Sequence, residues 1–151
     1  MSLGGSVSTA LDSAVLTSAN SGVFYSIAAG NSGVGACNSS PARAGVNNGV
    51  MTVAATSSTD AEASWSNYGS CVDIWAPGVS ILSTKLNGGT TTMSGTSMAA
   101  PHAGGTAALY LSSHVGATPA VVESDMKASG IWTGTLSKDG QPIKRLYAGA
   151  F

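Results

Sequence analysis

Short apolar runs separated by turn-forming residues dominate much of the chain. Apolar or small side chains share one helical face over residues 8–19, which predicts an amphipathic helix. Short runs rich in apolar and β-branched residues, mostly bounded by glycine, proline or asparagine, are predicted to be strands. They cover residues 23–29, 50–55, 71–76, 81–84 and 143–148.

A different pattern begins at residue 96. Alanines and one tyrosine recur about one turn apart through residues 96–113, which predicts a helix with a small-residue face. Thr118 followed by Pro119 indicates the start of another helix, to about residue 129, because proline is favoured in a first turn. Short strands alternating with helices favour an α/β fold with a mainly parallel sheet.

Composition narrows the class of protein. The 151 residues suffice for one domain, and no internal repeat or linker divides residues 1–151. Only 9% of residues are charged and the formal net charge is -1, so we expect no nucleic acid partner and no binding to an anionic membrane. No apolar run approaches the length of a membrane span, and the first residues do not resemble a signal peptide.

Two cysteines, Cys37 and Cys71, leave two interpretations open. They lack the spacing of a zinc site, so they are either buried free thiols or one disulfide. A disulfide closing so long a loop would contribute ~3–4 kcal/mol in the chain-entropy model. Few charges and a possible disulfide are compatible with a secreted protein.

The segment from Ser94 to His102 carries the strongest chemical signal. Ser97 is flanked by small residues where a helix is predicted to begin, so a substrate carbonyl could approach it and helix N–H groups would favour developing negative charge. The alternative is that Thr96 or Ser97 only caps the helix. Pro101 is compatible with either interpretation if it lies in the first turn.

These residues resemble the subtilisin-like serine proteases. Residues 95–102, GTSMAAPH, resemble the nucleophile motif of that family, although Ala100 stands where serine or threonine is usual. Four more blocks follow the family order: residues 1–5, 26–31, 64–69 and 73–78. The surroundings of Cys37 and Cys71 are most similar to the proteinase K and aqualysin-like branch, which favours the disulfide. The resemblance implies a subtilisin-like three-layer fold.

The resemblance also implies roles for individual residues. Ser97 would attack the substrate carbonyl, and Asn31 together with the Ser97 N–H would bind the oxyanion. Two sets of residues would bind the substrate: one would form an edge strand beside its backbone, and the other would form a wall of the primary specificity pocket. Because this wall is small and neutral, we expect an apolar or aromatic substrate side chain there. These sets are Ser2, Leu3 and Gly4, and Ala28, Ala29 and Gly30. Asp73, with the carbonyls of Asn48 and Val50, is a candidate Ca²⁺ site, and no organic cofactor is expected.

One departure from the family pattern decides what this chain is expected to do. The segments that carry the family's catalytic aspartate and histidine are absent, so the resemblance covers only the C-terminal half of a catalytic domain. His102 lies about 140° around the predicted helix from Ser97, and His114 lies near its end, so neither is expected to be the general base.

We therefore expect a piece of a secreted serine endopeptidase that forms an acyl-enzyme on Ser97 and acts on peptides or proteins. Weak esterase-type turnover is the alternative for this chain by itself. A third interpretation is a non-catalytic piece that self-assembles or complements the N-terminal half, because absent strands would leave unpaired sheet edges.

Overall fold

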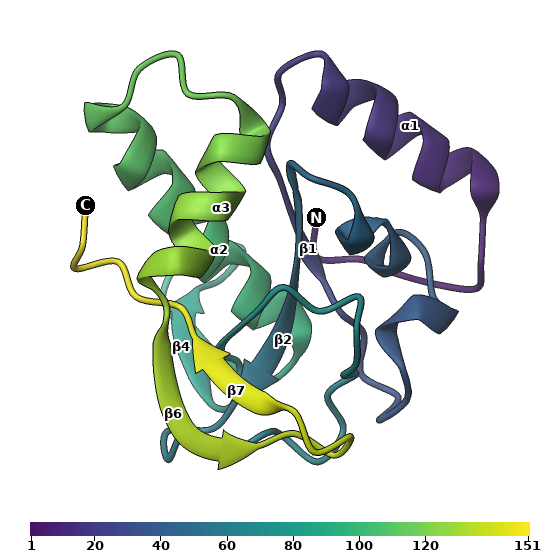
Figure 1. The fold of residues 1–151 in the computed structure, drawn as a ribbon. Helices are drawn as coiled ribbons and strands as arrows, with labels where there is room; N and C mark the ends of the chain where they lie inside the picture. The colour runs from purple at the N-terminus through teal and green to yellow at the C-terminus, as the bar shows by residue number, and fades with distance from the viewer.

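A five-stranded sheet forms the middle layer of the protein. The computed structural model describes all of residues 1–151, and its strand order is β1-β2-β3-β7-β6 (Figure 1). Strands β1, β2, β3 and β7 run parallel, and β6 pairs antiparallel with β7. The expected α/β fold with a mainly parallel sheet is confirmed. The strands are β1 (Tyr25–Ala28), β2 (Val50–Thr56), β3 (Ile74–Pro77), β6 (Ile131–Leu136) and β7 (Pro142–Arg145).

Helices cover both faces of this sheet (Figure 1). Helices α2 (Thr96–Ser113) and α3 (Pro119–Ser129) pack on one face. Helix α1 (Thr9–Asn20) and the 3₁₀ turns η1 (Ala36–Asn38) and η2 (Ala42–Val46) cover the other. The molecule therefore has three layers. Alanines on the buried face of α2 let this helix approach β1 and β2 closely.

Strand β2 is the centre of the core. All seven of its residues are buried, as expected of a parallel strand covered on both faces. Met51, Val53 and Ala55 face α2 and α3, whereas Val50 and Ala54 pack against the opposite layer. The short run predicted for residues 50–55, apolar apart from Thr52, thus corresponds to a strand without a solvent face.

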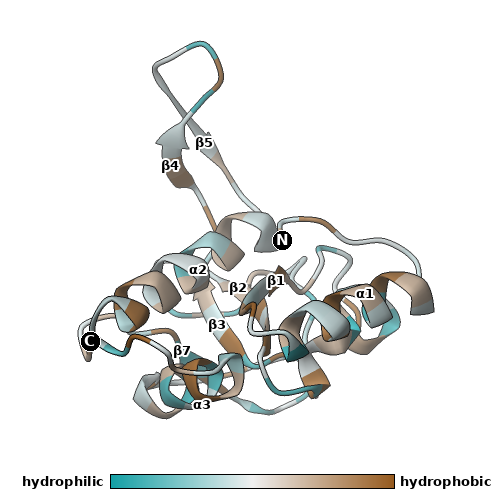
Figure 2. Cartoon of the chain, turned by 90° about the horizontal axis from the view of Figure 1, so that it is seen from above, coloured by the Kyte–Doolittle hydropathy of each residue, from teal (hydrophilic) through white to brown (hydrophobic).

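The segment 81–84 differs from the prediction. It forms β4 (Ile81–Thr84), which pairs antiparallel with β5 (Thr90–Met93) in a separate two-stranded hairpin. This hairpin projects away from the three layers (Figure 2), and most of its residues are exposed. The short β-branched run was correctly predicted as a strand, but it is not a buried strand of the main sheet. Strands β5 and β6 were not predicted.

Two of the three helices begin at a side-chain cap, whereas the N-cap of α2 is Gly95, so the alternative that Thr96 or Ser97 caps this helix was wrong. The Ser8 hydroxyl accepts a hydrogen bond from the Leu11 N–H, and the Thr118 hydroxyl accepts one from the Val121 N–H. Helix α2 begins at Thr96, so Pro101 lies inside the helix beyond its first turn. The expectation of a first-turn proline was wrong for Pro101.

Cys37 and Cys71 form a disulfide. Their Cα atoms are 5.4 Å apart, and the bond joins η1 to the segment that precedes β3. Of the two interpretations that the sequence left open, the disulfide is therefore confirmed and the free thiols are excluded. None of the helices combines the length and the apolar character that crossing a membrane requires.

Candidate active site

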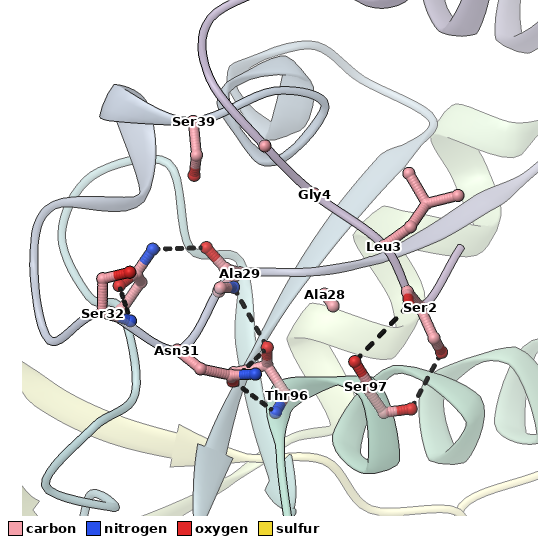
Figure 3. Close-up of a pocket in the computed structure, with 13 residues that line it drawn as sticks. Ser2, Leu3, Gly4, Ala28, Ala29, Asn31, Ser32, Ser39, Thr96 and Ser97 are labelled. Atoms are coloured by element: carbon pink, nitrogen blue, oxygen red, sulfur yellow. Dashed lines mark hydrogen bonds between the residues drawn. The ribbon is translucent and has the colours of Figure 1, made fainter.

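Ser97 is the second residue of α2, at the end of the helix where backbone N–H groups are free. Its Oγ lies 3.4 Å from the carbonyl oxygen of Ser2, and the Ser2 hydroxyl donates to the Ser97 carbonyl at 2.8 Å (Figure 3). Pro101 stands four residues later and has no N–H to donate to that carbonyl. The proline therefore frees the backbone acceptor that anchors the N-terminal segment beside the nucleophile.

Asn31 is held in one orientation by Thr96. Its Oδ1 accepts hydrogen bonds from the backbone N–H of Thr96 at 2.9 Å and from the Thr96 hydroxyl at 2.8 Å (Figure 3). Because the backbone N–H can only donate, it fixes which end of the amide is the oxygen. The Asn31 Nδ2 group is left as a donor with no hydrogen-bond partner in the chain, beside the pocket that also contains Ser97.

Thr96 is a positioning residue that the sequence interpretation did not identify. Its side chain is fully buried, and its hydroxyl accepts from the Gly30 N–H at 3.0 Å while it donates to Asn31. One hydroxyl thus joins α2 to the turn after β1. A threonine directly before the nucleophile was visible in the sequence, but it was interpreted only as a possible helix cap.

Asn67 supports the same turn from the other side, and it was also missed. Its Oδ1 accepts from the N–H groups of Ser32 and Val34 at 3.1 and 3.2 Å, and its Nδ2 donates to the Ala29 carbonyl at 2.8 Å. Gly30 has a φ of +105°, and a Cβ there would lie 2.4 Å from Asn67 Nδ2. The turn that carries Asn31 therefore needs both the buried amide and the glycine.

The predicted site residues meet in one pocket of about 390 Å³. Its lining includes the predicted nucleophile, the predicted oxyanion donor and both sets of predicted substrate-binding residues. These are Ser97, Asn31, Ser2, Leu3, Gly4, Ala28, Ala29 and Gly30. Backbone atoms, glycines and small side chains form most of the wall. The pocket is therefore open and polar, and none of its lining side chains is charged.

No general base stands beside the nucleophile in the described chain. The His102 ring nitrogen Nδ1 pairs with the Met98 carbonyl at 2.8 Å, although His102 and Ser97 line one pocket of about 320 Å³. His114 stacks on Tyr110 and bonds the carbonyl of that residue at the end of α2. The chain therefore brings Ser97 and the Asn31 amide to one pocket, but no histidine or carboxylate hydrogen-bonds Ser97 Oγ.

Comparison with known proteins assigns the family. A model described as the subtilase family matches residues 1–142. The chain belongs to the subtilase family. It is similar to alkaline serine exoprotease A of Vibrio alginolyticus, with 56% identity over 124 residues that cover 82% of this chain and 23% of the relative. An extracellular serine proteinase of Thermus sp. (strain Rt41A) is 53% identical over 82% of this chain and 30% of the relative.

The subtilase fold is also seen in a solved structure. The crystal structure of a cold adapted subtilisin-like serine proteinase superposes with a TM-score of 0.92 and 47% identity, covering 98% of this chain and 53% of that one. The chain thus spans about half the length of this solved relative, and 23% and 30% of the two curated relatives.

The candidate calcium residues of this subtilase do not fit a bound ion. Asp73 Oδ1 accepts from the Lys127 ammonium at 2.7 Å, and its Oδ2 accepts from the Thr52 N–H at 2.8 Å. Asn48 lines a cleft with Lys127, but the fully buried Val50 does not. Calcium takes six to eight oxygens, and here an ammonium group holds the carboxylate oxygen that a cation would need. No cluster of three metal-binding side chains is present.

Burial has opposite effects on the two charged partners. It raises the pKa of the Asp73 carboxyl group to about 7, against the hydrogen bonds from Lys127 and Thr52, which lower it. Partial burial lowers the pKa of the Lys127 ammonium, but the hydrogen bonds and charges of Asp73 and Glu123 raise it by more, so it lies above its usual value. Both partners are charged above pH 7.

Proposed function

We propose that this chain carries the nucleophile and oxyanion half of a serine endopeptidase site. The single observation that supports it most is the Asn31–Thr96–Ser97 arrangement, in which one amide is turned so that its N–H₂ group faces the pocket of the serine. Ser97 Oγ would attack the peptide carbonyl to form an acyl-enzyme. Asn31 Nδ2 and the Ser97 N–H would stabilise the oxyanion that develops.

The proposed substrate is an extended peptide with an apolar side chain. Ser2, Leu3 and Gly4 are exposed beside the nucleophile, where their backbone could pair with a substrate strand. The pocket has no charged group among its lining residues, so a charged side chain would enter without compensation. An apolar or aromatic side chain would bury its surface against Ala28 and Ala29.

The general base is proposed to come from a complementing polypeptide. Strand β1 is at the edge of the sheet, and Met1 alone lies along it, with the Ala28 N–H donating to the Met1 carbonyl at 3.0 Å. An open apolar groove of about 680 Å³ follows this edge between β1 and α2, lined by residues that include Phe24 and Leu111. A partner with parallel strands and a histidine would cover the groove and complete the site. A second copy of the chain is the alternative occupant.

A weaker activity is proposed for the chain without a partner. Hydrolysis of an activated ester needs no protonation of the leaving group, so Ser97 and Asn31 could support slow esterase turnover. Residual catalysis of ~10³–10⁴-fold over water remains in subtilisin when triad members are removed, which is the scale expected here. Peptide bonds would not be cleaved under the same conditions.

Secretion of the parent protein is proposed on two grounds. The Cys37–Cys71 disulfide is of the kind that forms in oxidising compartments, and one relative is named as an extracellular proteinase.

Active-site labelling tests the proposed function. A serine-directed phosphonate with an aromatic side chain is added to this chain alone, and to the chain mixed with the N-terminal half of the Thermus relative's catalytic domain; adducts are located by peptide mass spectrometry. We expect labelling of Ser97 in the mixture, slow or no labelling of the chain alone, and none in Ser97→Ala. If neither condition labels Ser97 although the halves associate, the enzymatic proposal is wrong.

A further inference from the structure

A lysine lies between two buried carboxylates at the junction of α3 with the sheet. Lys127 Nζ is 2.7 Å from Asp73 Oδ1 and 3.1 Å from Glu123 Oε1. The carboxylate side chains are only 5% and 6% exposed, whereas the lysine is 42% exposed. One cation thus serves two acidic groups that come from different layers of the fold.

The other oxygens of these carboxylates are also occupied. Asp73 Oδ2 accepts from the Thr52 N–H in β2, and Glu123 Oε2 accepts from the N–H of Gly49 just before β2. Every carboxylate oxygen therefore has one donor, and the two inner oxygens share the ammonium group. Each carboxylate is therefore also held by a backbone N–H group in β2 or directly before it.

Coulomb repulsion makes the shared cation necessary. Two desolvated carboxylates held side by side cannot both remain ionised without a positive charge between them. The position is open on one side to a cleft of about 190 Å³ that Asn48, Glu123 and Lys127 line together. A second cleft of about 510 Å³ is lined by Lys127 together with Asp73, so the ammonium position is reachable from the side of each carboxylate.

We propose that the Lys127 ammonium takes the place of a divalent cation between Asp73 and Glu123, so that the α3–sheet junction is held without calcium. The proposal follows from the failure of the calcium residues to fit an ion while the lysine is present. It concerns stability and does not depend on the proposed function. It implies a latent metal site, because removing the ammonium group leaves two buried carboxylates without their shared cation, each beside a cleft that Lys127 also lines.

The test is thermal unfolding of this chain at pH 8, where Asp73 is ionised, in 5 mM EDTA or 10 mM CaCl₂. The Tm of the wild type should be the same in both buffers within about 1 °C. Lys127→Ala in EDTA should melt about 5–10 °C lower, less than a fully buried pair would cost in a domain of this size, because the lysine is 42% exposed. Calcium should restore at least half of the loss.

Two further variants keep the result interpretable. Lys144→Ala removes a lysine that lies over Trp132 and donates to the Ala128 carbonyl, and it should respond to calcium no more than the wild type. Lys127→Met/Asp73→Asn removes the cation with one carboxylate and should fold without a calcium response. If Lys127→Ala folds only in calcium, that outcome supports the proposal.

Two outcomes overturn the proposal. The first is a wild-type Tm that rises by more than 3 °C with calcium, since it would show a metal site despite the lysine. The second is a Lys127→Ala variant that gains nothing from calcium, whether it melts early, melts like the wild type, or fails to fold in both buffers while the double variant folds.

Discussion

Replacing Thr96 by valine is the sharpest test of how the site is held. The change keeps the shape of the side chain and removes one fully buried hydroxyl. The Gly30 N–H then loses its acceptor at 3.0 Å, and Asn31 Oδ1 loses one of two donors. Leaving a fully buried donor unpaired costs about 1–3 kcal/mol, and the Gly30 N–H is partly buried, so we expect Thr96→Val to lower the free energy of unfolding by about 1–2 kcal/mol.

Thr106→Val is the matched control in the same helix. Thr106 is also buried, but its hydroxyl donates to the His102 carbonyl inside α2, so its removal orphans no donor and should cost under about 1 kcal/mol. Urea denaturation followed by circular dichroism measures both variants. The argument is refuted if Thr96→Val loses no more than Thr106→Val, because the hydroxyl would then not hold the turn in place.

Two other predictions concern the loops around the site. Gly30→Ala should lower the free energy of unfolding by about 2–4 kcal/mol, because backbone strain at φ +105° adds to the clash of a Cβ atom 2.4 Å from the Asn67 side chain. Gly22→Ala is the control: Gly22 has a φ of +106° and nothing within 4 Å of the added Cβ, so this variant should lose only about 1 kcal/mol in the same denaturation assay. Equal losses would show that Asn67 moves freely. Removing the disulfide with Cys37→Ser/Cys71→Ser should cost about 3–4 kcal/mol for its 34-residue separation, and a loss below 1 kcal/mol would contradict this.

The sequence predicted those parts of the fold that depend on local patterns. Helix α2 was found because its small residues repeat with helical spacing, and strand β2 because its residues are nearly all apolar over a short run. Strand β6 was missed because its burial is low and irregular, and the hairpin of β4 was misplaced because a short β-branched run does not reveal its partner. Local pattern carries no information on sheet order.

The residues of the candidate site also differ in whether local sequence could reveal them. Ser97 and Asn31 could be named because they lie in motifs that resemble a known family. Thr96 could not be given its role, because its contact with Asn31 joins positions 65 residues apart and depends on the packing of α2 against β1. The Lys127–Asp73 pair, 54 residues apart, was hidden for the same reason. The calcium site was expected there only because the resemblance to the proteinase K-like branch implies one at Asp73.

The central claim is that Asn31 and Ser97 act together on one carbonyl. The most direct measurement is the rate at which a phosphonate labels Ser97 in the complemented protein, compared between wild type and Asn31→Leu. Removing the corresponding amide from subtilisin slows catalysis about 10²–10³-fold, and we expect a loss of that order with the wild-type stability retained. A labelling rate unchanged by Asn31→Leu, or an adduct on another residue, would contradict the account.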